Sequence, residues 1–165
     1  MTTLLLIRHG IAEDYRPGLT DAERALTAEG WLKTRAAMRG LVALGHVPSR
    51  GISSPYRRAM ETMACLKEAV LAQDGAGVFP VGVWEGLVPD GDAGEAEAWL
   101  RQLMGGAGAD ERLAFTSHEP FLSSLVAQLT GRRIDVKKAS CTEIEWLGGG
   151  WRFVRHYPPA ELRGD

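Results

Sequence analysis

The stretch LLLIRHG, residues 4–10, decides the fold class of this sequence. Four consecutive apolar residues followed directly by polar ones are typical of a short strand that is buried on both faces of a sheet. Such strands alternate with helices in α/β proteins, whose ligands bind beyond the carboxyl ends of the strands. Arg8 and His9 follow the apolar run at once, so we expect both side chains at the ligand-binding edge of the sheet.

The rest of the chain repeats this alternation of short apolar runs and helical segments. Thr27 is typical of a residue that caps a helix, and this helix is predicted to run to about Leu44. Pro120 starts another helix, whose apolar residues recur at helical spacing up to Gly131. The other predicted segments are a weak strand at 52–53, a helix opened by Ser54 and Pro55, a peripheral strand at 78–81, a helix capped by Asp92 and a strand at 113–116.

The last part of the chain has a different period. Apolar and polar residues alternate over 142–157, and three glycines at 148–150 separate the two runs, which predicts a β-hairpin. Strand–helix alternation followed by a hairpin predicts an α/β fold: a three-layer α/β/α sandwich with a mostly parallel central sheet and a C-terminal β-hairpin. We expect a single domain over residues 1–165.

The composition argues against several classes of function. The 165 residues include 19 basic and 21 acidic ones, a net charge of −2, which disfavours binding to nucleic acid or to an anionic membrane. No apolar run approaches the roughly 20 residues that span a bilayer, and the short run at the start is not typical of a signal peptide. Cys65 and Cys141 form no zinc-binding or disulfide pattern, so we expect a cytoplasmic protein with reduced thiols.

Titratable and basic side chains gather at the predicted strand ends. His9 and His118 each follow a strand, and Arg57 and Arg58 lie at another strand-to-helix junction. Guanidinium groups and helix N-termini both favour an anion, either a phosphate or a carboxylate. Nearby positive charge also keeps an imidazole neutral and nucleophilic, so that it can attack phosphorus and form a phosphohistidine. Because arginines can stabilise the transferring group, we expect neither a metal nor another cofactor.

Five short motifs occur in a characteristic order along nearly the whole chain. They are LIRHG at 6–10, RALTAEG at 24–30, SPYRRAMET at 54–62, EGLVPDGD at 85–92 and SHEP at 117–120. Each motif alone is a weak signal, but five together in a chain this short are specific. Through them the sequence resembles the histidine phosphatase superfamily, which has a phosphoglycerate-mutase-like fold, and within it the short bacterial phosphohistidine phosphatases of the SixA type.

The resemblance implies a role for each residue that matches these motifs. It makes His9 the nucleophile that becomes phosphorylated, and His118 the second imidazole, which stabilises the transferring phosphoryl group. Arg8 and Arg58 become the residues that hold the phosphate, and Gly10 completes the phosphate-binding motif.

Two further residues are assigned by the resemblance. Arg24 falls where short members of the family place a basic residue near the mouth of the pocket. Glu85 falls in the region from which other members supply a general acid to an alkoxide leaving group. An imidazole leaving group needs less protonation, so the requirement for Glu85 depends on the substrate.

Together, the residues and the resemblance predict a metal-independent phosphatase that acts through a phosphohistidine on His9. The leading substrate is a phosphohistidine of a signalling protein, because 165 residues leave few for a lid and the site should be open. A small phosphorylated metabolite or sugar is the alternative substrate, and a non-catalytic module that binds phosphorylated ligands is a third interpretation. The expected partner is thus a phosphorylated protein or a small phosphorylated molecule, and we expect a monomer.

Overall fold

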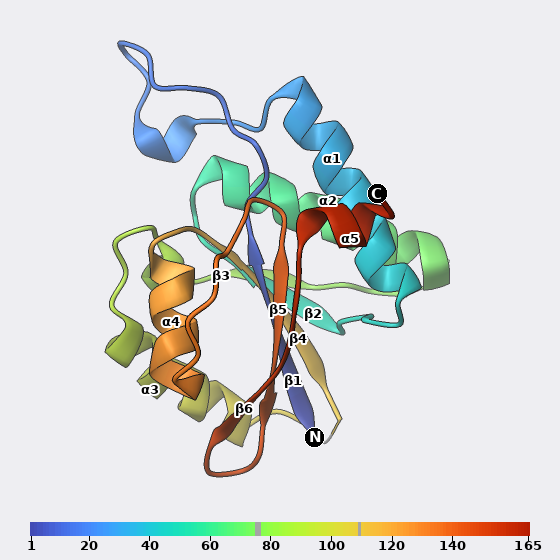
Figure 1. Ribbon diagram of the computed structural model, residues 1–165, viewed down its shortest axis with the longest axis vertical. Helices are drawn as coiled ribbons and strands as arrows, with labels where there is room; N and C mark the ends of the chain where they lie inside the picture. The colour runs from blue at the N-terminus through green and yellow to red at the C-terminus, as the bar shows by residue number, and fades with distance from the viewer. Residues whose placement is uncertain (75–76, 109) are drawn as a thin grey trace.

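A central sheet of six strands organises the protein (Figure 1). The strands lie in the order β3-β2-β4-β1-β5-β6. Strand β1 (Thr2–Arg8) pairs parallel with β4 (Arg112–Ser117) and antiparallel with β5 (Cys141–Trp146). The pairings among β3, β2, β4 and β1 are parallel, and β5 and β6 form an antiparallel hairpin, so the predicted, mostly parallel sheet is confirmed.

The computed structural model describes residues 1–74, 77–108 and 110–165. The remaining strands are β2 (Arg50–Ser53), β3 (Val81–Val83) and β6 (Trp151–Tyr157). The helices are α1 (Ala28–Ala43), α2 (Arg57–Asp74), α3 (Ala93–Gly105), α4 (Phe121–Thr130) and α5 (Pro159–Arg163), with short 3-10 helices η1 (Asp21–Glu23) and η2 (Glu85–Leu87). Among the helices of these residues, none has the length and apolar character needed to cross a membrane.

Alternate residues of β1 face opposite layers of helices, which explains why this strand is apolar throughout. Leu5 and Ile7 pack in one core with α1, α2 and α5, whereas Leu4 and Leu6 pack in a second core with α3 and α4. Full burial of such a side chain contributes roughly 1.5–3 kcal/mol. Helices cover both faces of the sheet in Figure 1, so the three-layer α/β/α sandwich is confirmed.

Three predicted helix ends are also confirmed. The Thr27 hydroxyl accepts from the Gly30 amide and caps α1, and the Asp92 carboxylate accepts from the Glu95 amide and caps α3. Gly131 ends α4 in the left-handed conformation, with φ of 74°, where a side chain would be strained.

Two element boundaries were predicted wrongly, and one helix was not predicted. Helix α2 begins at Arg57 and not at Ser54 and Pro55, because the Ser54 hydroxyl accepts from the Tyr56 amide and holds a bend there. Strand β3 covers Val81–Val83 and not 78–81; it starts only after Pro80, which has no amide hydrogen for a strand ladder. Helix α5 is a single turn that packs Leu162 into the core, too short for a periodic signal.

Candidate active site

The parallel pairing of β1 and β4 brings two histidines together at one edge of the sheet. His9 directly follows β1, and His118 directly follows β4. The His9 amide donates to the carbonyl of Ser117 at 3.0 Å, which ties the two strand ends together. The imidazole centroids lie 5.1 Å apart, and both side chains are buried. Two sequence positions more than a hundred residues apart therefore form one site.

Arg58, in the first turn of α2, lies against His9. Its Nε is 3.3 Å from Nε2 of His9, and the residue is only 4% exposed. Its neighbour Arg57 points outward and pairs with Glu61 on the same helix. Consecutive helical residues differ by about 100° in direction, so only one of the two arginines reaches the histidines.

The hydrogen bonds of His9 define which nitrogen is nucleophilic. Nδ1 lies 2.7 Å from the carbonyl oxygen of Gly10, which can only accept, so Nδ1 carries the proton. Nε2 then keeps its lone pair and accepts from Arg58. Burial lowers the pKa of His9 to about 3, the bond to Gly10 opposes this, and the charges of Arg58 and Arg8 lower the pKa further. His9 is therefore neutral at physiological pH.

His118 is held by a different partner and is also neutral. Its Nε2 lies 2.7 Å from the hydroxyl oxygen of Ser54, on the loop that precedes α2. Burial, and after it the nearby His9 and Arg58, lower the pKa of His118 to about 2. Its Nδ1 is buried and has no hydrogen-bond partner among the described residues. The hydrogen-bonding capacity of this atom is thus not used by any described residue.

Arg8 approaches the site from the end of β1. One terminal nitrogen donates to the carbonyl of Val136 at 2.9 Å, which fixes the side chain along the segment before β5. Its Nε is buried and, within the described part of the chain, has no partner. Arg8 therefore also keeps a donor free.

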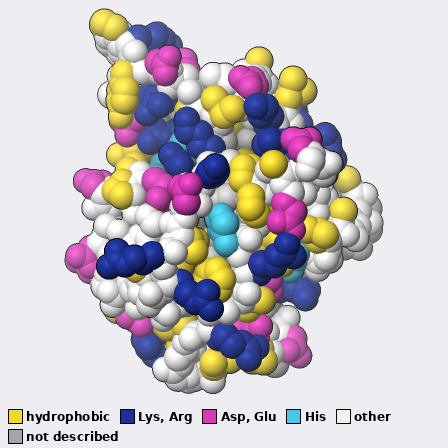
Figure 2. Space-filling model, viewed as in Figure 1, with side chains coloured by type: hydrophobic (Ala, Val, Ile, Leu, Met, Phe, Trp, Pro, Cys, Tyr) yellow, Lys and Arg dark blue, Asp and Glu magenta, His cyan; other side chains and the backbone are white. Residues whose placement is uncertain are grey.

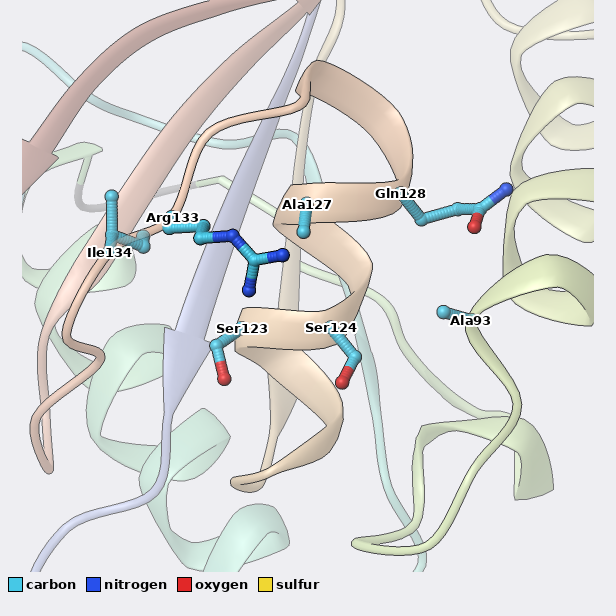
Figure 3. Close-up of a pocket in the computed structure, with 7 residues that line it drawn as sticks. All are labelled: Ala93, Ser123, Ser124, Ala127, Gln128, Arg133 and Ile134. Atoms are coloured by element: carbon cyan, nitrogen blue, oxygen red, sulfur yellow. The ribbon is translucent and has the colours of Figure 1, made fainter.

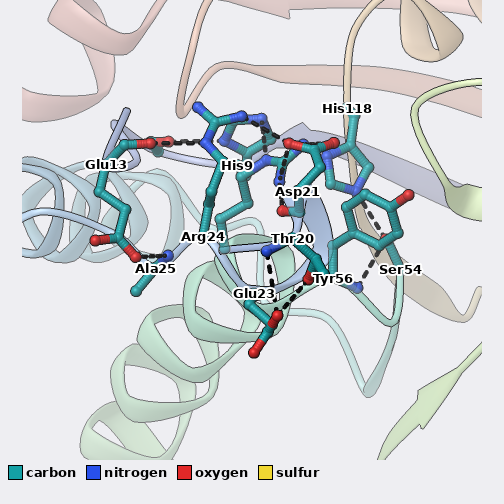
Figure 4. Close-up of polar contacts among 12 residues, drawn as sticks. His9, Glu13, Thr20, Asp21, Glu23, Arg24, Ala25, Ser54, Tyr56 and His118 are labelled. Atoms are coloured by element: carbon teal, nitrogen blue, oxygen red, sulfur yellow. Dashed lines mark hydrogen bonds and ion pairs between the residues drawn. The ribbon is translucent and has the colours of Figure 1, made fainter. Parts of the chain in front are cut away.

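The sequence analysis missed Asp21, which lies at the centre of the polar network in Figure 4. Arg58 donates to the Asp21 backbone carbonyl at 2.7 Å, and both carboxylate oxygens lie 3.3 Å from terminal nitrogens of Arg58. Arg24 also donates to the carboxylate, at 2.8 Å. Burial raises the pKa of Asp21, but hydrogen bonds from Arg24 and the charge of Arg58 outweigh it and hold the pKa below its usual value. The spacing of Asp21 and Arg24, three residues apart, was the available signal.

Two hydroxyl groups that support the site were also missed. Thr62 accepts from the Gly10 amide at 3.1 Å and donates to the Arg58 carbonyl at 2.8 Å, so it joins β1 to α2. Ser54 orients His118, as described above. Both are residues of the SPYRRAMET motif, its first and its last, and that motif was the available signal.

Three further predicted site residues take different places. The Gly10 amide is bound to Thr62, and a Cβ at this position would lie 2.0 Å from the Thr34 hydroxyl, so glycine allows the close approach of the loop to α1. Arg24 reaches the site through Asp21 and also donates to the Glu13 carbonyl at 2.7 Å. Glu85 is exposed in η2, and no hydrogen bond or ion pair of the described residues joins it to the histidines.

The site is more covered than the short chain predicted. His9 is 6% exposed and His118 1%, and the loop that carries Asp21 lies over them. Lys and Arg side chains gather around a histidine in the upper part of the face in Figure 2, where Figure 1 places the end of β1. Within the described ranges, no cluster of three or more His, Cys, Asp or Glu side chains has the arrangement of a metal site.

A groove of about 600 Å³ lies elsewhere, along α4 (Figure 3). Ser123, Ala127 and Arg133 are among its lining residues, and it contains none of the predicted site residues. Concavity alone does not locate the chemistry in this protein. The convergence of buried histidines and arginines does so.

Two neutral imidazoles and a buried guanidinium lie together at the carboxyl ends of parallel strands of this α/β protein, an arrangement whose chemistry suits an anion and a nucleophile. The family model described as histidine phosphatase superfamily (branch 1) matches residues 4–108. The chain belongs to this superfamily, and its membership supports phosphatase activity.

Individual proteins are similar to this chain in sequence or in fold. A protein of Picosynechococcus sp., itself described as uncharacterised, is 33% identical over 157 residues, which cover 93% of this chain and 89% of that protein. The structure of the protein histidine phosphatase SixA complexed with tungstate matches with a TM-score of 0.84 at 24% identity, over 97% of this chain and 99% of that one. Phosphoserine phosphatase from Entamoeba histolytica matches with a TM-score of 0.72 at 17% identity, over 98% and 100%. These structures share the fold.

Proposed function

We propose that the protein is a metal-independent phosphatase that works through a phosphohistidine on His9, and that its substrate is a phosphohistidine of another protein. The observation that carries the proposal is the state of His9: its Nδ1–H is bound to the Gly10 carbonyl, and its neutral Nε2 faces Arg58. A neutral imidazole that is oriented through the proton on one nitrogen and keeps the lone pair on the other is an activated nucleophile.

The proposed reaction has two displacements at phosphorus. In the first, Nε2 of His9 forms a bond to phosphorus while the bond from phosphorus to the leaving nitrogen breaks, and that nitrogen departs with the electron pair. In the second, water forms a P–O bond, the P–Nε2 bond breaks, and the proton of water passes to solvent. Arg58 and Arg8 stabilise the negative charge on the phosphoryl oxygens through both steps. When the Ser54 hydroxyl donates to Nε2 of His118, Nδ1–H of His118 is free to donate to the same oxygens.

The choice of a phosphohistidine rests on the leaving group. An imidazole leaves close to neutrality and needs little general-acid help, and no hydrogen bond or ion pair among the described residues joins Glu85, which is exposed, to the histidines. The structural similarity to SixA, described as a protein histidine phosphatase, supports the same choice. Cys65 and Cys141 are free and buried, which supports action in a reducing compartment such as the cytoplasm, where we propose the protein works as a monomer.

A trapping experiment tests the proposed intermediate. The protein is mixed with a histidine-containing protein domain that carries radioactive phosphate on its histidine, and the reaction is quenched with alkali within its first turnovers. We expect acid-labile, alkali-stable label on the wild-type protein and none on His9→Ala. The matched control is His156→Ala, which removes a histidine of the C-terminal hairpin and should keep the label. Substrate that stays phosphorylated with the wild-type protein would refute the proposed substrate.

A small phosphoester is the second candidate substrate, favoured by the similarity to a phosphoserine phosphatase structure solved in complex with 3-phosphoglyceric acid. An alkoxide leaving group needs an acid, so this candidate predicts that Glu85→Ala lowers ester turnover strongly. The phosphohistidine proposal predicts that Glu85→Ala leaves turnover unchanged. The two substrates are thus separated by one variant assayed on both.

A further inference from the structure

Asp21 lies in the site, but the proposed reaction gives it no role. Its carboxylate lies beside two terminal nitrogens of Arg58, while the Nε of the same guanidinium faces His9. Arg58 is therefore bound between the nucleophile on one side and a carboxylate on the other. A site for a phosphoryl dianion rarely benefits from a fixed negative charge, because the two repel each other. The position of Asp21 needs a reason.

The exposure of the three groups shows in which direction the carboxylate lies. His9 and Arg58 are 6% and 4% exposed, whereas the Asp21 side chain is 32% exposed. Asp21 is therefore on the solvent side of Arg58, and the nucleophile is on the inner side. In an in-line displacement the leaving group departs opposite to the nucleophile, so it leaves toward the solvent side. The Asp21 carboxylate and a departing leaving group are thus on the same, solvent side of the site.

The carboxylate is ionised and interacts with the rest of the site. Burial raises the pKa of Asp21, but hydrogen bonds from Arg24 and the charge of Arg58 outweigh it and lower this pKa. The charge of Asp21 also acts on His118, where it opposes the lowering of the pKa by burial. Figure 4 shows Asp21 among His9, Arg24 and His118. A leaving group at this point meets a negative charge.

We propose that Asp21 is a specificity-determining residue, which favours phosphoryl substrates whose leaving nitrogen belongs to a group that is positively charged before the P–N bond breaks over those whose leaving oxygen becomes negative. The inference rests on the proposed phosphatase function and refines its substrate class. As the P–N bond breaks, the nitrogen takes the electron pair and its group goes from a cation to a neutral amine or imidazole. In the transition state this group still has partial positive charge near the carboxylate, which lowers the barrier measured from free enzyme and substrate. A departing alkoxide or aryl oxide gains negative charge there and is repelled.

A simpler role must be separated from this one, because Asp21 also holds Arg58 in place. The backbone carbonyl of Asp21 accepts from Arg58 at 2.7 Å, and this bond does not depend on the side chain. Asp21→Asn keeps the size of the side chain and removes only its charge. If Asp21 merely positions Arg58, this variant changes the turnover of all phosphoryl substrates by the same factor, because Arg58 binds the part that they share.

The experiment compares two small substrates that differ in their leaving group. Phosphoramidate is protonated on nitrogen and releases neutral ammonia, whereas p-nitrophenyl phosphate releases a negative aryl oxide. We measure kcat/KM for both with the wild-type protein, Asp21→Asn, Asp21→Glu and Asp14→Asn. Asp14 is exposed in the same loop, so its variant makes an equal change in net charge. Thermal melting shows that each variant is folded.

We expect Asp21→Asn to lower the ratio of kcat/KM for phosphoramidate to that for p-nitrophenyl phosphate about fivefold, the size of a charge interaction at a partly exposed site. Asp21→Glu should keep more of the wild-type ratio, and Asp14→Asn all of it. An unchanged ratio for Asp21→Asn would overturn the inference, whether or not both rates fall. The result is independent of the protein substrate: a wild-type protein that cleaves phosphoramidate but leaves a phosphohistidine domain intact defeats the proposed substrate alone.

Discussion

The carboxyl ends of β1 and β4 and the C-terminal hairpin both carry polar side chains, but the hydrogen bonds of these side chains are satisfied differently. In the hairpin the polar groups pair with each other: Tyr157 donates to Glu143 at 3.1 Å, and Arg152 to Glu145 at 2.8 Å. At the strand ends, Nε of Arg8 and Nδ1 of His118 are buried without a hydrogen-bond partner in the described part of the chain. An unpaired buried polar atom costs about 1–3 kcal/mol, so such atoms are expected where a ligand supplies the partner.

The largest expected effect is on kcat/KM, and it compares an arginine at the strand ends with an arginine of the hairpin. We expect Arg58→Ala to lower kcat/KM about 100- to 1,000-fold, because it removes buried donors to the transferring phosphoryl group. Arg152→Ala removes an exposed ion pair of the hairpin and should change kcat/KM less than about twofold. Steady-state assays on a phosphohistidine substrate measure both variants. A similar loss in the two would mean that the strand ends are not the site of the reaction.

The same two regions show what can be predicted from the sequence. The hairpin was predicted because its signal is local: alternation along each strand and glycines between them. His9, His118 and Arg58 were found through short motifs, each at the junction of two elements. The contacts that orient them were not found, since Asp21 and Arg58 are 37 residues apart and Ser54 and His118 are 64 apart. Such pairs depend on strand order and register, which a single sequence does not specify.

A second, smaller effect is the dependence of stability on pH. His9 and His118 have pKa values of about 3 and 2 in the folded protein, below the 6.5 of an unfolded histidine. As the pH falls below 6.5 the unfolded chain binds protons that the folded protein does not, so the free energy of unfolding decreases. Between pH 6.5 and about 5 we expect a loss of about 1.5 kcal/mol for each of the two histidines.

Urea unfolding at pH 7 and pH 5 measures this loss, and two variants compare the regions. His9→Asn removes one titrating site, so its free energy of unfolding should fall less between the two pH values than that of the wild-type protein. His156 of the hairpin is less buried, and burial lowers its pKa too, so His156→Asn should reduce the loss by a smaller amount. Equal pH dependence in the wild-type protein and His9→Asn would contradict the low pKa of His9.

The smallest expected effect is on the free energy of unfolding, and it compares a glycine beside His9 with a glycine in the hairpin turn. A Cβ on Gly10 would lie 2.0 Å from the Thr34 hydroxyl oxygen, which is buried, so Gly10→Ala should lower the free energy of unfolding by about 2 kcal/mol. No atom lies within 4 Å of a Cβ on Gly149, so Gly149→Ala should be neutral to about 0.5 kcal/mol. Thr34→Ala removes the clashing oxygen and, combined with Gly10→Ala, should restore most of the stability, as urea unfolding of the single and double variants would show. A double variant as unstable as Gly10→Ala would mean that the loop from β1 needs glycine for its backbone conformation and not for its approach to α1.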